Sequence, residues 1–239
     1  MLPRFLKHLT VLFDFMKIAE NELENMNPEI KLKSTAEEKD EFRKMMKERL
    51  REYEKDFLTM QKNAESAFKS FTQSELYKDS RTILAFMSSG FELDTHAVVK
   101  KALQDGKSVA IPRIISEGEM DFCYLSAQKS LESQLEKNAY NILEPKTDLE
   151  KLDAEHLPVH TVLLVPGLAF SRSGARLGRG KGYYDRYIEK LYAQKSVIHL
   201  PTAIIGWGAE LQVFDEIPID DHDAMVTHIV TEKGIFLCE

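Results

Sequence analysis

The chain has 239 residues, a formal net charge of -7 and a hydrophobic share of 43%. Its two cysteines, Cys123 and Cys238, exclude a disulfide framework and a cysteine-based metal site, and they favour a reducing compartment. The acidic balance argues against general nucleic-acid binding, which needs a broad basic face, and no apolar run is long enough to span a bilayer. We therefore expect a globular protein that acts on small molecules, with neither nucleic acid nor membrane as a partner.

Residues 1–34 are expected to form an N-terminal extension or linker, ahead of a single domain at residues 35–239. Residues 1–17 carry basic and spaced apolar side chains, as a mitochondrial presequence does, but they include Asp14 and no serine. We therefore expect a cytoplasmic protein whose extension packs loosely. Import into mitochondria through residues 1–34 is the alternative.

A long amphipathic helix is predicted to begin at Thr35. Thr35 and Glu38 fit a capping box, in which each side chain satisfies a free backbone N–H of the first turn. Apolar residues then recur at helical spacing, at Phe42, Met45, Met46, Leu50, Tyr53 and Phe57. The pattern predicts a helix with a heavily charged outer face, followed by more helix to about residue 71.

From residue 82 onward, short apolar runs alternate with helical segments. The predicted strands are 82–87, 108–112, 120–125, 160–166, 201–207 and 224–230. The predicted helices are 95–103 and 183–193, and residues 126–158 are expected to be irregular with short helical stretches. Pro112 is expected to end the second strand, and the unbroken apolar run at 160–166 is typical of a strand buried on both faces. The alternation predicts an α/β sandwich around a mostly parallel sheet.

The run SRSGARLGRGKGYYDR at residues 171–186 predicts a phosphate-binding loop. It lies between a predicted strand and the helix that begins at Tyr183, where helix N-termini offer free N–H groups to anions. Its alternating glycines let successive N–H groups face one anion, and the added positive charge comes from Arg176, Arg179 and Lys181. Asp185, in the first turn of the helix, is suited to hold Mg²⁺ against phosphates.

The loop differs from the two best-known phosphate motifs. A Walker A frame would place glycine first and Ser or Thr last, but here Ala175 and Gly182 occupy those positions. The third glycine of a dinucleotide fingerprint would fall on Tyr183. The run therefore indicates a phosphate cradle of another kind, with a basic surface loop that binds nothing as the alternative.

The stretch LLVPGLAFSRSGARLGRGKGYYDRY closely resembles the signature of the 5-formyltetrahydrofolate cyclo-ligase family, whose members are also called 5,10-methenyltetrahydrofolate synthetases. A looser resemblance extends from about residue 36 to residue 232. It implies a three-layer α/β/α sandwich and a reaction that uses ATP and Mg²⁺ to convert 5-formyltetrahydrofolate into 5,10-methenyltetrahydrofolate, releasing ADP and phosphate. It also implies that the glycine-rich loop holds the ATP phosphates and that Asp185 is a Mg²⁺ ligand.

The resemblance assigns further residues one by one. The ATP-binding set that it implies is Lys39, Arg43, Arg176, Leu177, Gly178, Arg179, Gly180, Lys181, Gly182, Tyr183 and Tyr184. The folate-binding set that it implies is Met87, Glu92, Tyr140, Arg179 and Tyr183, with Tyr140 stacking on the pterin. The second Mg²⁺ ligand that it implies is Asp223, for which Asp220 and Asp221 are alternatives by composition.

Each of these assignments has an ordinary structural alternative. Lys39 and Arg43 lie on one helix face, where charges usually face solvent. Glu92 alone would be a surface acid before a helix, and Tyr140 alone would be a packed loop anchor. Gly90-Phe91 replaces more polar residues of the family pattern, which leaves the shape of that loop and its effect on the substrate open.

We expect the catalytic residues to be Lys181, Arg179 and Glu92. ATP would phosphorylate the formyl oxygen, and N10 would then close the ring as phosphate leaves; the two cations stabilise the transferring phosphate while Glu92 orients the formyl group or helps to move the N10 proton. The alternatives are an inactive relative that binds RNA or a nucleotide, or a sugar-phosphate isomerase on a related fold. We expect a monomer or weak homodimer.

Overall fold

The structure is a computed structural model, and it describes residues 35–139, 141–193 and 200–239. Three helices open the described part of the chain: α2 (Thr35–Lys55), α3 (Phe57–Gln73) and α4 (Glu75–Asp79). The predicted helix therefore begins where we expected but does not run unbroken past residue 55. Asp56 leaves the helical conformation, and its carboxylate accepts a hydrogen bond from the Thr59 N–H at 3.1 Å, so it caps the start of α3.

The central sheet has seven strands within the described ranges, in the order β12-β11-β9-β6-β1-β2-β3. Its strands are β1 (Thr82–Leu84), β2 (Ser108–Ser116), β3 (Glu119–Leu125), β6 (Thr161–Pro166), β9 (Ala203–Trp207), β11 (His228–Thr231) and β12 (Gly234–Leu237). The neighbours from β11 to β2 pair in parallel, whereas β3 and β12 are antiparallel strands at the two edges. The prediction of a mostly parallel sheet is confirmed.

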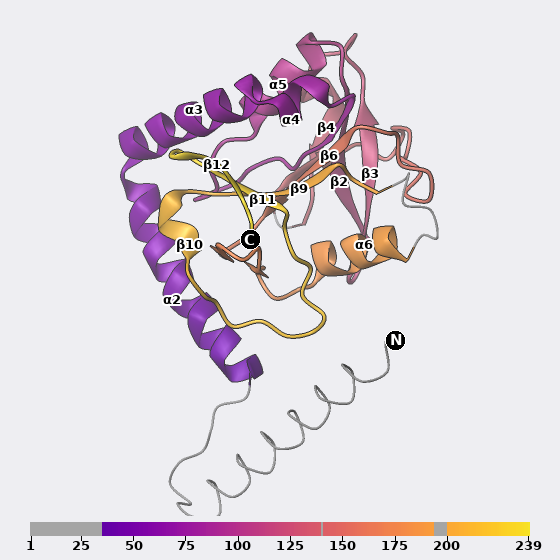
Figure 1. Ribbon diagram of the computed structural model, residues 1–239. Coiled ribbons are helices and arrows are strands. Elements are labelled where there is room, and N and C mark those ends of the chain that lie inside the picture. The colour runs from indigo at the N-terminus through magenta and orange to yellow at the C-terminus, as the bar shows by residue number, and fades with distance from the viewer. Residues whose placement is uncertain (1–34, 140, 194–199) are drawn as a thin grey trace, which may run out of the picture. The chain divides into compact units, whose positions relative to one another are not determined.

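Helices cover both faces of this sheet (Figure 1). One face packs against α3, α4 and α5 (His96–Gln104), and the other packs against α6 (Tyr183–Tyr192). Successive residues of one strand alternate between the two cores: Val162 lies on the α3–α5 side and Leu163 on the α6 side. Burial on both faces explains the unbroken apolar run of β6, and the three-layer sandwich is confirmed.

A second, smaller sheet lies beside α2. It consists of β10 (Val213–Phe214), β7 (Ala169–Ser171) and β8 (Arg176–Leu177), in that order. Met46 and Leu50 of α2 are fully buried and share a core with Leu168 and Leu177. This core fixes β8, and therefore the start of the glycine-rich run, against the long helix.

Two predictions about secondary structure are wrong. Pro112 does not end β2, which continues to Ser116 with Pro112 paired to Phe122 of β3. The Ala110 carbonyl accepts from the Ala85 N–H on the β1 side, so the missing N–H of Pro112 also faces that side, where β1 has already ended at Leu84. Residues 126–158 contain two paired strands, β4 (Leu135–Lys137) and β5 (Leu143–Pro145), and one short 3-10 turn at Glu132–Gln134.

The remaining elements agree with the prediction in kind and differ at their ends. The strands predicted at 82–87 and 224–230 begin or end inside those ranges, and β12 follows as an additional strand that the sequence pattern did not indicate. A second 3-10 turn spans Glu210–Gln212. Within the ranges that the structure describes, every helix falls short of the length and apolarity that a membrane crossing requires.

Candidate functional site

A cavity of about 440 Å³ lies where β1 and β6 end. Met87, which comes shortly after β1, and Pro166-Gly167, at the end of β6, contribute to its wall. Ligands in open α/β sheets bind beyond the carboxyl ends of the strands, so the cavity occupies the expected position. Its wall combines apolar side chains, such as Phe86, Ile114 and Met120, with charged and polar ones, which suits an organic ring that carries charged groups.

The glycine-rich loop, residues 178–182, connects β8 to α6 and forms one wall of the cavity. Gly180 has a φ of 101° and Gly182, the residue before α6, has a φ of 66°; these are left-handed conformations that favour glycine. No side chain among the described residues caps α6, so its first N–H groups have no such partner. This geometry at a helix N-terminus would suit the binding of an anion, so we call the loop an anion cradle.

Most residues of the predicted nucleotide loop line this cavity. Those that do are Arg176, Gly178, Arg179, Lys181, Gly182, Tyr183 and Tyr184, together with Asp185. Two predicted residues do not. The Leu177 side chain is buried in the core beside α2, and Gly180 faces the Arg43 side chain.

Arg176 holds Asp185 in a buried ion pair. The guanidinium is 3% exposed, its Nη2 lies 2.5 Å from Asp185 Oδ1, and its Nη1 donates to the Pro166 carbonyl at 3.1 Å. The backbone N–H of Ala224 also donates to Asp185 Oδ1, at 3.2 Å. The predicted ATP contact and the predicted Mg²⁺ ligand are therefore partners, and the segment that carries Asp223 lies next to Asp185.

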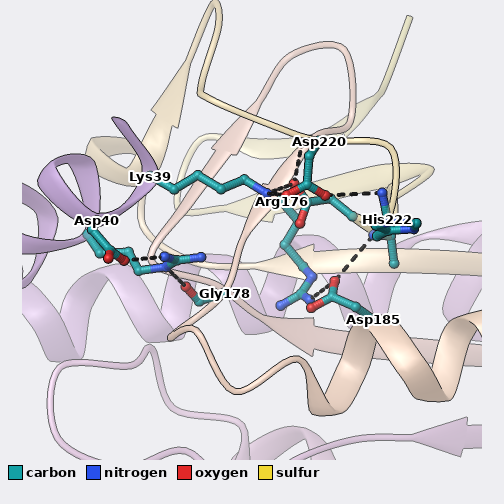
Figure 2. Close-up of polar contacts among 10 residues, drawn as sticks. Lys39, Asp40, Arg176, Gly178, Asp185, Asp220 and His222 are labelled. Carbon is teal, nitrogen blue, oxygen red and sulfur yellow. Dashed lines mark hydrogen bonds and ion pairs between the residues drawn. The ribbon is translucent and has the colours of Figure 1, made fainter. Parts of the chain in front are cut away.

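Lys39 binds Asp220, as Figure 2 shows, and it also pairs with Asp223. Its side chain is 4% exposed, and its Nζ lies 2.6 Å from Asp220 Oδ2. Burial opposes the charge on Lys39, but hydrogen bonds with both carboxylates outweigh burial and raise its pKa. The same contact with Lys39 lowers the pKa of Asp220. Lys39 therefore joins α2 to the C-terminal segment that carries the predicted second metal ligand.

Arg43, one helical turn after Lys39, supports the glycine-rich loop from the α2 side. Its Nε donates to the Gly178 carbonyl at 3.2 Å, and its Nη1 pairs with Asp40 at 2.6 Å. Neither Lys39 nor Arg43 lines the cavity. The sequence placed both on one helix face, and the structure brings that face to the loop and to Asp223.

Glu92 meets Arg179 across the cavity wall. Glu92 Oε1 accepts from Arg179 Nη2 at 2.6 Å, and Oε2 accepts from the Ser89 N–H at 2.9 Å. Burial raises the pKa of the Glu92 carboxyl, although the Arg179 charge and the Ser89 hydrogen bond oppose this shift. The Arg179 guanidinium also lies over the Phe91 ring, 4.8 Å from its centroid. Phe91 is thus a platform for a predicted catalytic residue.

The two predicted metal ligands do not form a larger acidic cluster. Within the described ranges, no group of three or more His, Cys, Asp or Glu residues is placed to hold a metal ion. Asp185 and Asp223 are two carboxylates from adjoining segments, each paired with a cation. Mg²⁺ commonly takes one or two carboxylates and completes its shell with phosphate oxygens and water, so this pair fits that ion.

Sequence reasoning missed two features of the site, and one residue that it predicted cannot be placed. Arg186 donates to the carbonyls of Lys181 and Gly118, which joins the loop to the β2–β3 turn, yet by composition it is one more surface arginine on a helix. Glu144, a buried carboxylate in the cavity wall, lies in the region expected to be irregular. Tyr140, the predicted pterin platform, lies outside the described residues.

A cavity at the strand ends, a glycine-rich loop and flanking cations, on an α/β sandwich, would suit an anionic ligand with an organic ring. Comparison with known proteins gives the family. The model of the 5-formyltetrahydrofolate cyclo-ligase family matches residues 35–232, and the chain belongs to that family. The match shows the resemblance seen in the glycine-rich run over most of the chain.

Individual relatives agree with this assignment. The 5-formyltetrahydrofolate cyclo-ligase of Mus musculus is 31% identical over 159 residues, which is 66% of this chain and 76% of that protein. A probable 5-formyltetrahydrofolate cyclo-ligase of Caenorhabditis elegans is 28% identical over 200 residues, or 82% of this chain and 93% of that protein. The solution structure of Aquifex aeolicus 5,10-methenyltetrahydrofolate synthetase matches with a TM-score of 0.66 and 25% identity, covering 84% of this chain and 93% of that one.

Proposed function

We propose that the protein uses ATP to convert 5-formyltetrahydrofolate into 5,10-methenyltetrahydrofolate, releasing ADP and phosphate. Family membership supports the reaction class. The observation that carries the proposal is the Glu92–Arg179 pair, because it joins an acid of the cavity wall to the anion cradle. A folate ring in the cavity would then place its formyl group beside Glu92 and next to a phosphate held by the loop.

In this proposal ATP binds with its phosphates on the loop at residues 178–182 and the N-terminus of α6. Arg179 and Lys181 supply positive charge from the loop, and both line the cavity. Arg43 holds the Gly178 carbonyl and so keeps the loop in shape. Lys39 is expected to reach the phosphates only after it releases Asp220 and Asp223, since both carboxylates bind it here.

Asp185 and Asp223 would hold Mg²⁺ in this site, with Arg176 and Lys39 as their present partners. Bound Mg²⁺ supplies charge neutralisation to the phosphates during transfer. The residues of the chain then do the positioning. Arg176 fixes Asp185 from the buried side, and the Ala224 N–H keeps the segment after Asp223 against α6.

The proposed chemistry has two steps. The formyl oxygen attacks the γ-phosphorus of ATP, the bond from phosphorus to the ADP oxygen breaks, and a phosphorylated formyl group results at N5. N10 then attacks the formyl carbon, loses its proton, and inorganic phosphate leaves with the oxygen. Glu92 orients the formyl group and accepts the N10 proton, directly or through water, and a pKa raised above the ordinary value by burial makes its carboxylate a better proton acceptor.

A direct assay tests the proposal. Purified protein is mixed with (6S)-5-formyltetrahydrofolate, Mg²⁺ and ATP, and the near-ultraviolet band of the methenyl product is followed with and without ATP. We expect ATP-dependent growth of the band and its loss in the Lys181→Ala variant, whose exposed side chain contributes little to stability. A folded protein that is stabilised by ATP but forms no product would refute the activity and turn attention to the alternative, an inactive relative that binds RNA or a nucleotide.

Three further points belong to the same proposal. We place the protein in the cytoplasm, with mitochondria as the alternative through residues 1–34; one relative, from Arabidopsis thaliana, is named a mitochondrial cyclo-ligase. We expect a monomer or weak homodimer. Residues 35–239 are expected to act as a single domain, with residues 1–34 as an extension.

A further inference from the structure

We infer that Glu144 recognises the amino-pyrimidinone edge of the ring that enters the cavity, and that it determines which ring is accepted. The inference rests on the proposed folate reaction for the identity of the ring. Glu144 lies in β5, in the hairpin that β4 and β5 form. It lines the cavity beside the apolar side chains of Ile142 and Leu143.

Glu144 is a buried carboxylate, and only one of its two oxygens accepts hydrogen bonds from the described residues. The residue is 5% exposed. Its Oε1 accepts two hydrogen bonds, from the Ile114 backbone N–H at 3.2 Å and from Asn138 Nδ2 at 2.7 Å. Its Oε2 has no hydrogen-bond partner among the described residues, and yet it is not among the buried polar atoms cut off from open space. The second oxygen therefore remains available to a ligand in the cavity.

Nearby positive charge is directed elsewhere. The Arg113 guanidinium, on the strand that donates to Glu144, pairs with Glu136 at 2.6 Å and donates to the Pro145 carbonyl at 2.5 Å. Within the described ranges, Glu144 takes part in no ion pair. Buried carboxylates are costly unless they are hydrogen-bonded or paired, and two neutral donors on one oxygen satisfy Glu144 only in part.

The ligand group that fits is a pair of adjacent N–H donors on a flat ring. The cavity offers apolar side chains around Glu144, including Met87, Ile114 and Leu143, and these suit the faces of a ring. A pterin carries its N3–H and 2-amino group side by side on the pyrimidinone edge, and such parallel donors face the two oxygens of one carboxylate, so the 2-amino group can donate to the free Oε2 while N3–H lies beside Oε1. The Glu92–Arg179 pair is then left for the formyl group of the same ligand.

The test compares two ligands and three proteins by direct binding, without ATP. The probes are 5-formyltetrahydrofolate and its 2-desamino analogue, which lacks the amino group. The proteins are the wild type, Glu144→Gln and the matched control Glu150→Gln. Glutamine keeps an oxygen for the Ile114 and Asn138 donors but turns an NH₂ group toward the ligand. Glu150 is exposed and lies outside the cavity wall.

We expect the wild type and the control to bind the desamino analogue at least about tenfold more weakly than 5-formyltetrahydrofolate. Glu144→Gln should bind 5-formyltetrahydrofolate about as weakly as the wild type binds the analogue, and it should barely distinguish the two ligands. A purely structural role would lower thermal stability but preserve the discrimination. Equal affinity of the wild type for both ligands would overturn the inference, even if the variant did not fold.

The same proteins separate this inference from the proposed reaction. Methenyl product formed by Glu144→Gln with an unchanged KM for the folate would overturn the role of Glu144 and leave the reaction intact. Glu144-dependent binding of the folate without any product would overturn the reaction and leave the role of Glu144 intact. A folded wild-type protein that binds neither probe would overturn both.

Discussion

Arg179 and Glu92 are 87 residues apart in the chain, yet Arg179 Nη2 lies 2.6 Å from Glu92 Oε1. The pair joins the glycine-rich loop to the segment between β1 and α5. Because Glu92 is buried while Arg179 is 47% exposed, the carboxylate experiences desolvation more strongly than the guanidinium does. The relationship therefore fixes the position of Glu92 and at the same time leaves its pKa above the ordinary range.

The raised pKa of Glu92 predicts a pH dependence of stability. An acid whose pKa is higher in the folded than in the unfolded state binds more protons when folded, so its contribution is fully present below the unfolded pKa of about 4.5 and is lost as pH rises through the folded value. Glu92→Gln removes this titration. The free energy of unfolding of Glu92→Gln relative to wild type should therefore increase as pH rises across that window, and then level off.

Urea unfolding at a series of pH values measures this difference, and activity should fall in the same variant. Glu119→Gln is the matched control at an exposed position, the start of β3, where the Glu119 carboxylate accepts from the Ser116 hydroxyl at 2.8 Å. A wild type that gains stability relative to Glu92→Gln as pH rises would show that Arg179 outweighs burial, contrary to the assigned direction.

The buried Arg176–Asp185 pair predicts a large loss of stability on removal of one partner. Arg176→Met leaves Asp185 with the Ala224 N–H but without its cation, and it should lower the free energy of unfolding by about 3 kcal/mol. Adding Asp185→Asn to Arg176→Met removes the uncompensated charge and should recover part of the loss. Denaturant unfolding of both variants measures the two values.

Arg172→Met is the control for this experiment. Arg172 is 57% exposed, and its contacts with Glu210 and Asp215 are 3.7 Å and 3.4 Å long. Its removal should change stability by no more than about 0.5 kcal/mol. Losses of equal size at Arg172 and Arg176 would contradict the view that burial makes the difference.

Periodicity predicted the sandwich because its strands and helices bury long, regular apolar patterns. The run at 160–166 is β6, and the helix expected at 183–193 is α6 (Tyr183–Tyr192). The short strands β4 and β5 escaped prediction because three residues carry too little pattern, and their pairing with each other decides the outcome. Asp56 interrupts the first helix through a local cap that the apolar spacing does not reveal.

The residues of the site were likewise predictable only in part. The glycine-rich loop has a composition that marks it in the sequence, and the structure places most of it on the cavity wall. Lys39, Glu92 and Asp223 have no such mark, and only the family resemblance singled them out. Glu144 had neither mark nor resemblance, because its role depends on burial and on donors from Ile114 and Asn138 that are distant or unremarkable in sequence.

The proposed metal ligands predict a shift in the Mg²⁺ requirement. Asp185→Asn and Asp223→Asn should each raise the Mg²⁺ concentration for half-maximal activity by about tenfold or more, because each removes an anionic oxygen ligand. Asp221→Asn, an exposed neighbour in the same segment, is the control and should leave the titration unchanged. An unchanged Mg²⁺ titration in both Asp185→Asn and Asp223→Asn would refute the assignment.

Phe91 predicts a moderate effect that depends on its ring. The Arg179 guanidinium lies 4.8 Å from the centroid of Phe91, and such a contact contributes about 0.5–1 kcal/mol at a partly exposed site. Phe91→Leu keeps the apolar volume but removes the ring face, so Arg179 retains only its pair with Glu92 on that side. We expect kcat/KM to fall by about two- to fivefold.

Phe91→Tyr keeps the ring and is the matched variant, with kcat/KM expected to stay at the wild-type value. If Phe91→Leu matched the wild type, the stacking would have no part in placing Arg179. If Phe91→Tyr lost as much as Phe91→Leu, the shape of the loop at Gly90, whose φ is 60°, would be the cause instead of the ring. Leucine and tyrosine at one position thus separate an aromatic platform for Arg179 from a requirement of the loop backbone.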